Sequence, residues 1–321
     1  MAESESESES ESESGTEVAP SPSPSLVTSL LREQVPEFAH LPVRLSATSG
    51  SSNWVFRLGD DLAVRMPRTD GYTPDLLNEV RWLPRLASQL PVPVPAIVAV
   101  GQPSELFARP WTVVSWVPGN TPGLPETLDS DQQDRFARSL GEFLNALHAI
   151  DPEGAPSGSE HWGYRCGEPV TDTIDGWAEE AAYELADLFD PAAVREAWRR
   201  LRDVPSASQP PSLVHCDVSA ENVLIHSDGR LAGVIDFGGL GVGDRSIDFL
   251  YAWSLVDAPA RAVLRAAAGV DHATWARARA WAFVGPGLLT IADYRDTMPA
   301  RTTRLIGMVE AVAAEVGMPL R

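Results

Sequence analysis

The sequence has 321 residues and an acidic balance, with 45 Asp and Glu against 25 basic residues, none of which is lysine. The net charge of −20 argues against nucleic-acid binding, which needs basic patches, and is compatible with a cationic substrate or with solubility alone. No apolar run approaches the length of a membrane span, and two cysteines are too few for a disulfide framework, which favours a cytoplasmic location.

The first 25 residues are of low complexity and are predicted to form a disordered tail. A Ser-Glu alternation is followed there by Pro-Ser repeats, and such a composition has too little apolar content to build a core. Residues 26–38 then predict a short amphipathic helix that ends near Pro36.

Small polar residues cluster between residues 45 and 55. Ser51, Ser52 and Asn53 lie there between apolar, strand-like flanks. A strand-turn-strand of this kind can lie over triphosphate oxygens and donate backbone N–H groups to them. A plain surface hairpin would have the same sequence, so the phosphate-binding interpretation depends on motifs further along the chain.

The next segments predict a mixture of strands and amphipathic helices, followed by an acidic stretch. The strands are expected at residues 61–67, 96–100 and 111–117, and the helices at 78–87 and 131–150. Residues 172–190 then place seven acids among apolar residues at helical spacing. They form either an exposed helix face or a surface that captures a cationic substrate, for which the candidates are Asp175, Glu179 and Glu180.

The strongest signal in the sequence lies between residues 214 and 238. His215, Asp217 and Asn222 match the spacing His-x-Asp-x-x-x-x-Asn, and Asp236 begins an Asp-Phe-Gly triplet, as in the protein-kinase signature. Phosphoryl transfer needs one carboxylate to orient the acceptor hydroxyl and take its proton, and an amide and a second carboxylate to hold Mg²⁺ against the phosphates. Asp217 fits the first role, and Asn222 and Asp236 fit the second.

The segment between these motifs predicts how the metal ligands meet. Residues 223–225 and 231–235 are expected to be buried strands, joined by a turn that contains Asp228-Gly229, a strong hairpin signal. A hairpin brings its two outer ends together, so Asn222 and Asp236 are expected to lie side by side.

This stretch resembles the catalytic loop and metal-binding segment of the aminoglycoside phosphotransferase family, kinase-like enzymes that phosphorylate antibiotic hydroxyls. Cys216 in place of arginine, a glycine-rich run after Gly238 and the lack of an Ala-Pro-Glu motif favour that family over protein kinases. Asp244 and Asp248 resemble the family's Asp-x-x-x-Asp step into the next helix, and we expect both to be structural. The resemblance implies an α+β, two-lobed kinase-like fold, with a small antiparallel-sheet lobe at residues 26–115 and a larger, mainly helical lobe at 116–321.

The resemblance also implies roles in nucleotide binding. Arg65 takes the place of the phosphate-binding lysine of kinases, with Arg68 as the alternative, and an arginine fork can hold phosphate oxygens. Glu79 matches the glutamate that positions this cation. The backbone of Ser115 and Val117 is expected to hydrogen-bond the adenine or guanine base.

The function expected from these residues is Mg²⁺-dependent transfer of the γ-phosphate of ATP or GTP to a hydroxyl of a small, cationic molecule. An aminoglycoside-type antibiotic is the favoured acceptor, and in the resembled family acids in the C-terminal helices help to bind it, which adds the candidates Asp293 and Asp296. The alternatives are a kinase for a macrolide, a metabolite or a biosynthetic intermediate, and a nucleotide-binding pseudokinase, which the departure at Arg65 would suit.

Overall fold

The computed structural model describes residues 21–46, 52–157 and 170–321. Most of the expected tail, and Ser51, therefore lie outside the described residues. The chain divides into two compact units, a larger one made of residues 74–98 and 114–321 and a smaller one made of the remainder. A sheet dominates the smaller unit and helices the larger one, so the expected α+β class is confirmed.

The smaller unit is built on a five-stranded sheet of order β1-β2-β3-β5-β4, whose strands are β1 (Val43–Leu45), β2 (Asn53–Leu58), β3 (Leu62–Pro67), β4 (Ile97–Gly101) and β5 (Trp111–Ser115). Strands β1, β2 and β3 pair antiparallel, and β4 and β5 run across the boundary between the units. Gly59 makes the turn from β2 to β3 with φ +60°, a left-handed conformation that glycine adopts at little cost.

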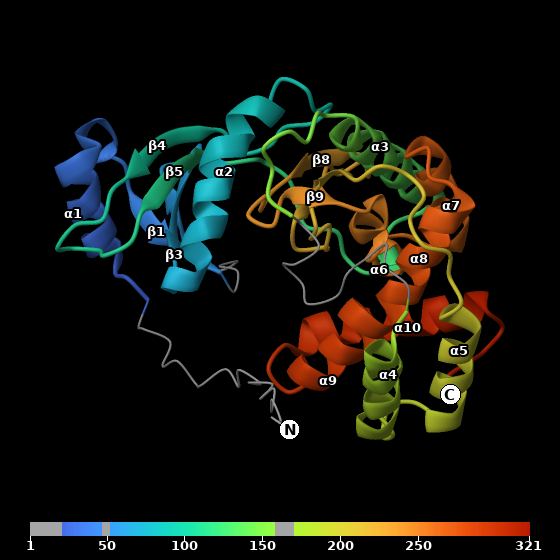
Figure 1. Cartoon of the computed structure of the whole chain (residues 1–321). Coiled ribbons are helices and arrows are strands. Elements are labelled where there is room, and N and C mark those ends of the chain that lie inside the picture. Colours follow the sequence, from blue (N-terminus) through green and yellow to red (C-terminus); the bar gives the residue numbers. More distant parts are fainter. Residues whose placement is uncertain (1–20, 47–51, 158–169) are drawn as a thin grey trace, which may run out of the picture. The chain divides into compact units, whose positions relative to one another are not determined.

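Helix α1 (Pro24–Gln34) packs on this sheet (Figure 1). Ser23 caps its first turn, since the Ser23 hydroxyl accepts a hydrogen bond from the backbone of Leu26 at 3.1 Å. Its apolar face, which includes Leu30 and Leu31, is buried with the sheet side chain Phe56. Two short 3₁₀ turns, η1 (Pro36–Phe38) and η2 (Asp70–Tyr72), complete the unit.

The larger unit is mainly helical. Its helices are α2 (Thr73–Leu86), η3 (Pro125–Thr127), α3 (Ser130–His148), α4 (Asp172–Glu184), α5 (Pro191–Leu201), η4 (Arg245–Phe249), α6 (Ala252–Leu255), α7 (Ala258–Ala267), α8 (His272–Ala282), the π-helix η5 (Phe283–Leu289), α9 (Thr290–Tyr294) and α10 (Pro299–Glu315). Helix α3 begins in a capping box at Asp129 and lies along α7 (Figure 1). Gly141 permits this close contact, because a Cβ there would lie 2.6 Å from the Cβ of Ala267.

Two short antiparallel pairs of strands carry the segment with the strongest sequence signal. Strand β6 (Ser212–Val214) pairs with β9 (Gly241–Gly243), and β7 (Val223–Ile225) pairs with β8 (Leu231–Val234). The second pair is the expected hairpin, which is confirmed. Most of its apolar side chains belong to the large core of this unit.

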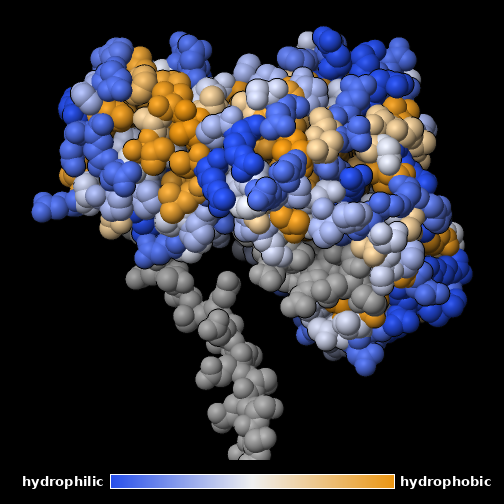
Figure 2. Space-filling model, turned by 45° about the horizontal axis from the view of Figure 1, so that its top comes forward, coloured by the Kyte–Doolittle hydropathy of each residue, from blue (hydrophilic) through white to orange (hydrophobic). Residues whose placement is uncertain are grey.

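The surface drawn in Figure 2 is mostly hydrophilic, with small apolar patches between the polar side chains. Large apolar residues that are exposed include Leu45, Leu106 and Tyr183. Among the described helices, none combines the length and the apolar character that crossing a bilayer requires.

Candidate active site

The β7–β8 hairpin brings the two expected metal ligands to one end. Val223 pairs with Val234, and the backbone N–H of Ile235 donates to the carbonyl of Asn222 at 2.9 Å. Asp236 follows directly, so it leaves the hairpin beside Asn222. Oxygen atoms of an amide and a carboxylate are ligands that suit Mg²⁺.

Asp217 is held by Asn222. The Nδ2 of Asn222 donates to the Oδ2 of Asp217 at 2.7 Å and to its backbone carbonyl at 3.0 Å. With Nδ2 used in this way, the amide oxygen is the side-chain atom of Asn222 that could bind a metal. These hydrogen bonds therefore hold the expected base, Asp217, next to the expected metal ligand Asn222.

The environment of Asp217 suits a general base. Burial raises its pKa to about 7, and the negative charge of Asp236 adds to this rise, whereas the positive charge of Arg301 opposes it. A carboxyl with a pKa near the working pH is well matched to proton transfer. Its second oxygen, Oδ1, is buried and accepts no hydrogen bond within the described parts of the chain. A hydroxyl that donated to Oδ1 would satisfy it.

His215 supports the loop from inside. Its ring is fully buried, and this burial lowers its pKa, which favours the neutral form. Its Nδ1 accepts a hydrogen bond from the backbone N–H of Asp217 at 3.2 Å, and its Nε2 lies 3.1 Å from the carbonyl of Ile235. The imidazole thus links the catalytic loop to the end of the hairpin.

Asp248 holds the backbone of the catalytic loop. Its carboxylate accepts the N–H groups of His215 at 3.1 Å and Cys216 at 2.8 Å, and it lies 2.8 Å from the Nε2 of His148. Cys216 and Asp236 adopt left-handed conformations, with φ values of 73° and 64°, which cost roughly 1–3 kcal/mol each outside glycine. The hydrogen bonds from Asp248 stabilise the first of these strained residues.

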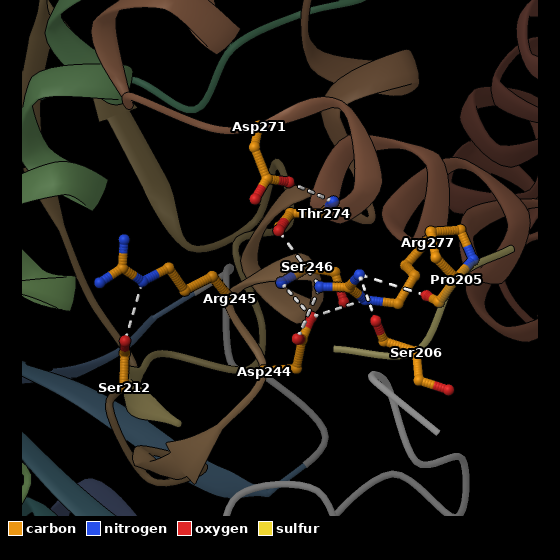
Figure 3. A network of polar contacts seen from close by, with 9 residues as sticks. All are labelled: Pro205, Ser206, Ser212, Asp244, Arg245, Ser246, Asp271, Thr274 and Arg277. Atoms are coloured by element: carbon orange, nitrogen blue, oxygen red, sulfur yellow. Dashed lines mark hydrogen bonds and ion pairs between the residues drawn. The ribbon is translucent and has the colours of Figure 1, made fainter. Parts of the chain in front are cut away.

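A second buried network fixes the segment that carries Asp248 (Figure 3). Asp244 caps η4, as expected, by accepting the backbone N–H of Ser246 at 2.9 Å. Arg277 of α8, whose side chain is 1% exposed, donates to the Oδ2 of Asp244 at 2.8 Å and to the hydroxyl of Thr274 at 3.1 Å. Its Nη1 also donates to the carbonyl of Pro205 at 3.3 Å. Arg277 of α8 therefore holds in place the segment from Asp244 to Asp248.

Helix α2 binds the backbone that follows Asp236, the expected metal ligand. The Oε1 of Glu79 accepts the N–H of Phe237 at 2.8 Å, and the Nδ2 of Asn78 donates to the carbonyls of Gly238 and Leu240 at 3.0 and 2.8 Å. Glu79 is 2% exposed. Glu79 therefore positions the Asp-Phe-Gly segment. This contact was not expected from the sequence, which predicted only that Glu79 pairs with a cation.

The smaller unit carries the residues expected to hold phosphate. Arg65 is a buried residue of β3, opposite Val55 of β2, and Asn53 begins β2 with its Nδ2 donating to the hydroxyl of Ser52 at 3.1 Å. Arg68 follows β3, and its guanidinium lies 5.7 Å from the ring centre of Trp54.

The two residues expected to contact the base lie at the end of β5 and just after it. The backbone N–H of Ser115 donates to the carbonyl of Ala96 at 2.9 Å, and its hydroxyl accepts the N–H of Ala96 at 2.8 Å. Val117 is buried and packs closely against Gly233, because a Cβ added to Gly233 would lie 2.4 Å from the Cγ1 of Val117. The N–H of Ser115 is thus already used within the chain.

Two of the acids expected to bind the acceptor have arginine partners. Asp175 accepts from Arg202 at 2.5 and 2.8 Å and from the indole of Trp198 at 2.8 Å, and the hydrogen bonds from Arg202 lower its pKa. Glu179 is bound by the Nε of Arg195, with both oxygens within 2.8 Å.

The other three acids expected at the acceptor site are exposed. Glu180 lies on α4, Asp293 lies on α9, and Asp296 follows α9. Within the described residues, Glu180 and Asp293 form no ion pair. These two carboxylates are therefore more available to a ligand than Asp175 and Glu179.

Arg301 was not foreseen from the sequence. It lies in the first turn of α10, and its charge acts on Asp217. Pro299 marks a helix start in the sequence, but a helix start does not say which loop the helix faces. Nothing local singles out this arginine.

Together, the fold and these residues define a kinase-like phosphotransferase site. A family model described as the phosphotransferase enzyme family APH matches residues 45–281. The chain belongs to this family, as its motifs indicated, and it is a phosphotransferase with a hydroxyl group as acceptor.

Individual relatives agree with this assignment. An aminoglycoside 3′-phosphotransferase from Escherichia coli is 26% identical over 233 residues, which cover 70% of this chain and 77% of the relative. Among solved structures, a GDP and kanamycin complex of an APH(2″) enzyme aligns with a TM-score of 0.67 at 20% identity, over 90% of this chain and 98% of the other. A macrolide 2′-phosphotransferase from Brachybacterium faecium aligns with a TM-score of 0.56 at 20% identity, over 89% and 97%. At these identities, the structural likeness shows the kinase-like fold alone.

Proposed function

We propose that this protein transfers the γ-phosphate of ATP or GTP, as its Mg²⁺ complex, to a hydroxyl of a small molecule. The observation that carries this proposal is the set at the base of the β7–β8 hairpin, where Asn222 bonds Asp217 at 2.7 Å and adjoins Asp236. Asp217 orients the hydroxyl and takes its proton. The acceptor oxygen bonds to the γ-phosphorus as the bond from that phosphorus to the leaving nucleoside diphosphate breaks.

Mg²⁺ fits the residues of the larger unit. In the described chain, no group of three or more His, Cys, Asp or Glu side chains could hold a metal by itself. Mg²⁺ does not need one, since it keeps several waters and is bound by one or two protein oxygens together with the phosphates. Asn222 and Asp236 would supply these oxygens, and the metal would neutralise charge on the phosphates.

The smaller unit, in this proposal, supplies nucleotide contacts. Ser51, Ser52 and Asn53 donate to phosphate oxygens, and Arg65 holds the α- and β-phosphates. Arginine replaces lysine here with a bidentate fork rather than a point charge. Ser115 and Val117 belong to the larger unit, and they bind the base through backbone atoms other than the N–H of Ser115, which already donates to Ala96. A nucleotide-dependent reaction suits a cytoplasmic location.

The acceptor that we propose first is an aminoglycoside-type antibiotic. The names of the relatives support this class, and exposed acids of the larger unit (Glu180, Asp293 and Asp296) would attract its ammonium groups. A macrolide is the second candidate, because a macrolide phosphotransferase is also a structural relative.

A transfer assay tests the proposal. The protein is incubated with Mg²⁺, ATP or GTP, and a panel of aminoglycosides and macrolides, and each product is examined by mass for one added phosphate. Asp217→Asn should slow formation of the product by roughly 10²–10⁴-fold, whereas Asp228→Asn, a matched change in the hairpin turn, should leave it unchanged. Hydrolysis of nucleotide without transfer to any acceptor would contradict the proposal.

The metal role has a separate test. Asp236→Ala should weaken binding of a fluorescent nucleotide in the presence of Mg²⁺ and leave the weaker binding without Mg²⁺ unchanged, because only the first depends on the bridging metal. Equal Mg²⁺ dependence in the wild type and in Asp236→Ala would remove Asp236 from the metal site.

A further inference from the structure

A groove of the larger unit shares no residue with the candidate active site. It lies between helix α7, the start of α8 and the end of α10, and its volume is about 500 Å³. Cavities of this size hold small organic molecules. The phosphate transfer proposed above uses none of the side chains that line it.

The apolar part of the groove is made of small side chains and one aromatic ring. Ala258, Ala262 and Ala266 are exposed and follow one another at four-residue spacing along α7, so they lie on one face of the helix. Helix α8 contributes Trp275, whose ring centre lies 4.9 Å from that of the buried Trp253. This contact holds Trp275 in place, so the aromatic border of the groove is formed before any ligand binds.

The charged side chains at the groove leave an excess of positive charge. Glu315, at the end of α10, accepts from the Nε of Arg261 at 2.8 Å and lies 3.5 Å from the Nη1 of Arg279. One carboxylate is therefore shared by two guanidinium groups. Arg265, which also lines the groove, donates through Nε to the carbonyl of Val270 at 3.3 Å and forms no ion pair within the described residues. Its positive charge is left for an anion.

The acids that flank the groove in sequence are used elsewhere. Asp257 and Asp271 precede α7 and α8, and their carboxylates accept the backbone N–H groups of Ala260 at 2.9 Å and Thr274 at 2.7 Å. Both carboxylates therefore cap helices, and neither lines the groove. In a chain of net charge −20, this groove is thus a local exception that favours a negative ligand.

We propose that this groove is a second ligand site, which binds a small aromatic carboxylate. The carboxylate accepts charge-assisted hydrogen bonds from the guanidinium of Arg265. The ring of the ligand packs against Trp275 and the alanines of α7, where its apolar surface leaves water. This site is separate from the nucleotide and the acceptor hydroxyl, so the inference does not rest on the proposed function.

Three probes separate the contributions of charge and ring: 2-naphthoate, the neutral 2-naphthylmethanol, which has the same ring, and acetate, which has the charge alone. Binding of each to the full chain is measured by titration calorimetry. The variants are Arg265→Met, Arg265→Lys and Ala262→Leu, of which the last fills the groove. The matched controls are Arg138→Met on α3 and Ala192→Leu on α5, which change an exposed arginine and an exposed alanine on other helices.

The wild type should bind one 2-naphthoate per chain, at least about tenfold more tightly than 2-naphthylmethanol, as expected for one charge-assisted hydrogen bond, and should bind acetate more weakly than either. Arg265→Met should lose the preference for the charged ring, and Arg265→Lys should keep part of it, which separates lost charge from a folding defect. Ala262→Leu should weaken the binding of both ring-bearing probes. The two controls should bind as the wild type does, and saturating Mg²⁺–ADP should not displace 2-naphthoate.

Four results would overturn the inference. The first is no saturable binding of 2-naphthoate, and the second is equal binding of 2-naphthoate and its neutral analogue. The third is binding that Arg265→Met and Ala262→Leu both leave unchanged, since the probe would then lie outside the groove. The fourth is displacement by Mg²⁺–ADP, which would place the probe in the nucleotide site. None of these measurements uses phosphate transfer, so the proposed function can fail or hold independently of them.

Discussion

The acids of α4 and the acids of the catalytic loop use their charges in opposite ways. Asp175 and Glu179 are partly exposed, and each is bound directly by an arginine of or next to α5. Asp217 is more enclosed, and its Oδ1 accepts no hydrogen bond from the described residues. The α4 acids stabilise the fold through their arginines, whereas Asp217 has no arginine bound to its carboxylate among the described residues.

The difference shows why acidic composition does not identify an acceptor site. The stretch at 172–190 is the denser in acids, but two of its three candidates are neutralised by arginines that come later in the sequence. A carboxylate binds a ligand only with the hydrogen-bonding capacity that the protein leaves unused. Four changes, taken from the largest expected effect to the smallest, test this contrast.

Asp217→Asn should have the largest effect. The amide keeps the size of the side chain and its bond to Asn222 but cannot take the hydroxyl proton, so kcat should fall by roughly 10²–10⁴-fold. Nucleotide affinity should stay the same, as measured by fluorescence titration beside single-turnover rates. Near-normal turnover would show that Asp217 does not act as the base.

Asp248→Asn should damage stability and turnover together. Its carboxylate accepts two backbone N–H groups and contacts His148, and an amide would place a donor against one of these donors. Breaking such a buried set costs about 3 kcal/mol of unfolding free energy. Urea unfolding and kcat should report the loss in parallel, and a large loss of stability with unchanged kcat would contradict a role in holding the loop.

Asp175→Asn should lower stability by a smaller, pH-dependent amount. The pKa of Asp175 is lowered in the folded protein, chiefly by its hydrogen bonds to Arg202, so its contribution is present above the unfolded value of 3.8 and disappears as the pH falls further. At pH 7 the variant should be less stable by about 0.5–1 kcal/mol, since the pair is partly exposed. The difference should shrink as the pH falls below 3.8, and acceptor KM should not change.

Glu179→Gln and Glu180→Gln should separate a paired acid from an unpaired one. Glu179 already binds Arg195, so Glu179→Gln should leave acceptor KM the same and, because the pair is exposed, should change stability very little. Glu180→Gln should raise the KM for a cationic acceptor about twofold. Added salt should produce the same rise in the wild type. Equal effects of the two changes on KM would mean that the ion pair of Glu179 opens for the acceptor.

The hairpin and the closeness of Asp217, Asn222 and Asp236 could be predicted because their geometry is local. Asp217 and Asn222 are five residues apart, and a tight hairpin returns the chain to Asp236, so spacing alone brings the three together. The α+β class followed from the resemblance that the same residues carry.

Other parts of the site depend on contacts between distant residues and left no local pattern. Arg277 reaches Asp244 across 33 residues, Asp175 meets Arg202 across 27, and the charge of Arg301 lowers the pKa of Asp217 from a position near the end of the sequence. The second role of Glu79 was hidden for the same reason, because its partner Phe237 lies 158 residues away. A single sequence does not contain the packing that creates such pairs.

The two amides that donate to Asp248 offer a readout of the catalytic loop that needs no substrate. Hydrogen exchange at His215 and Cys216 requires an opening that breaks their bonds to a carboxylate buried beneath the loop. Slow exchange at these two positions would therefore report an intact loop in any variant, before an acceptor is known. Fast exchange would separate variants that have lost the shape of the loop from those that have lost only its chemistry.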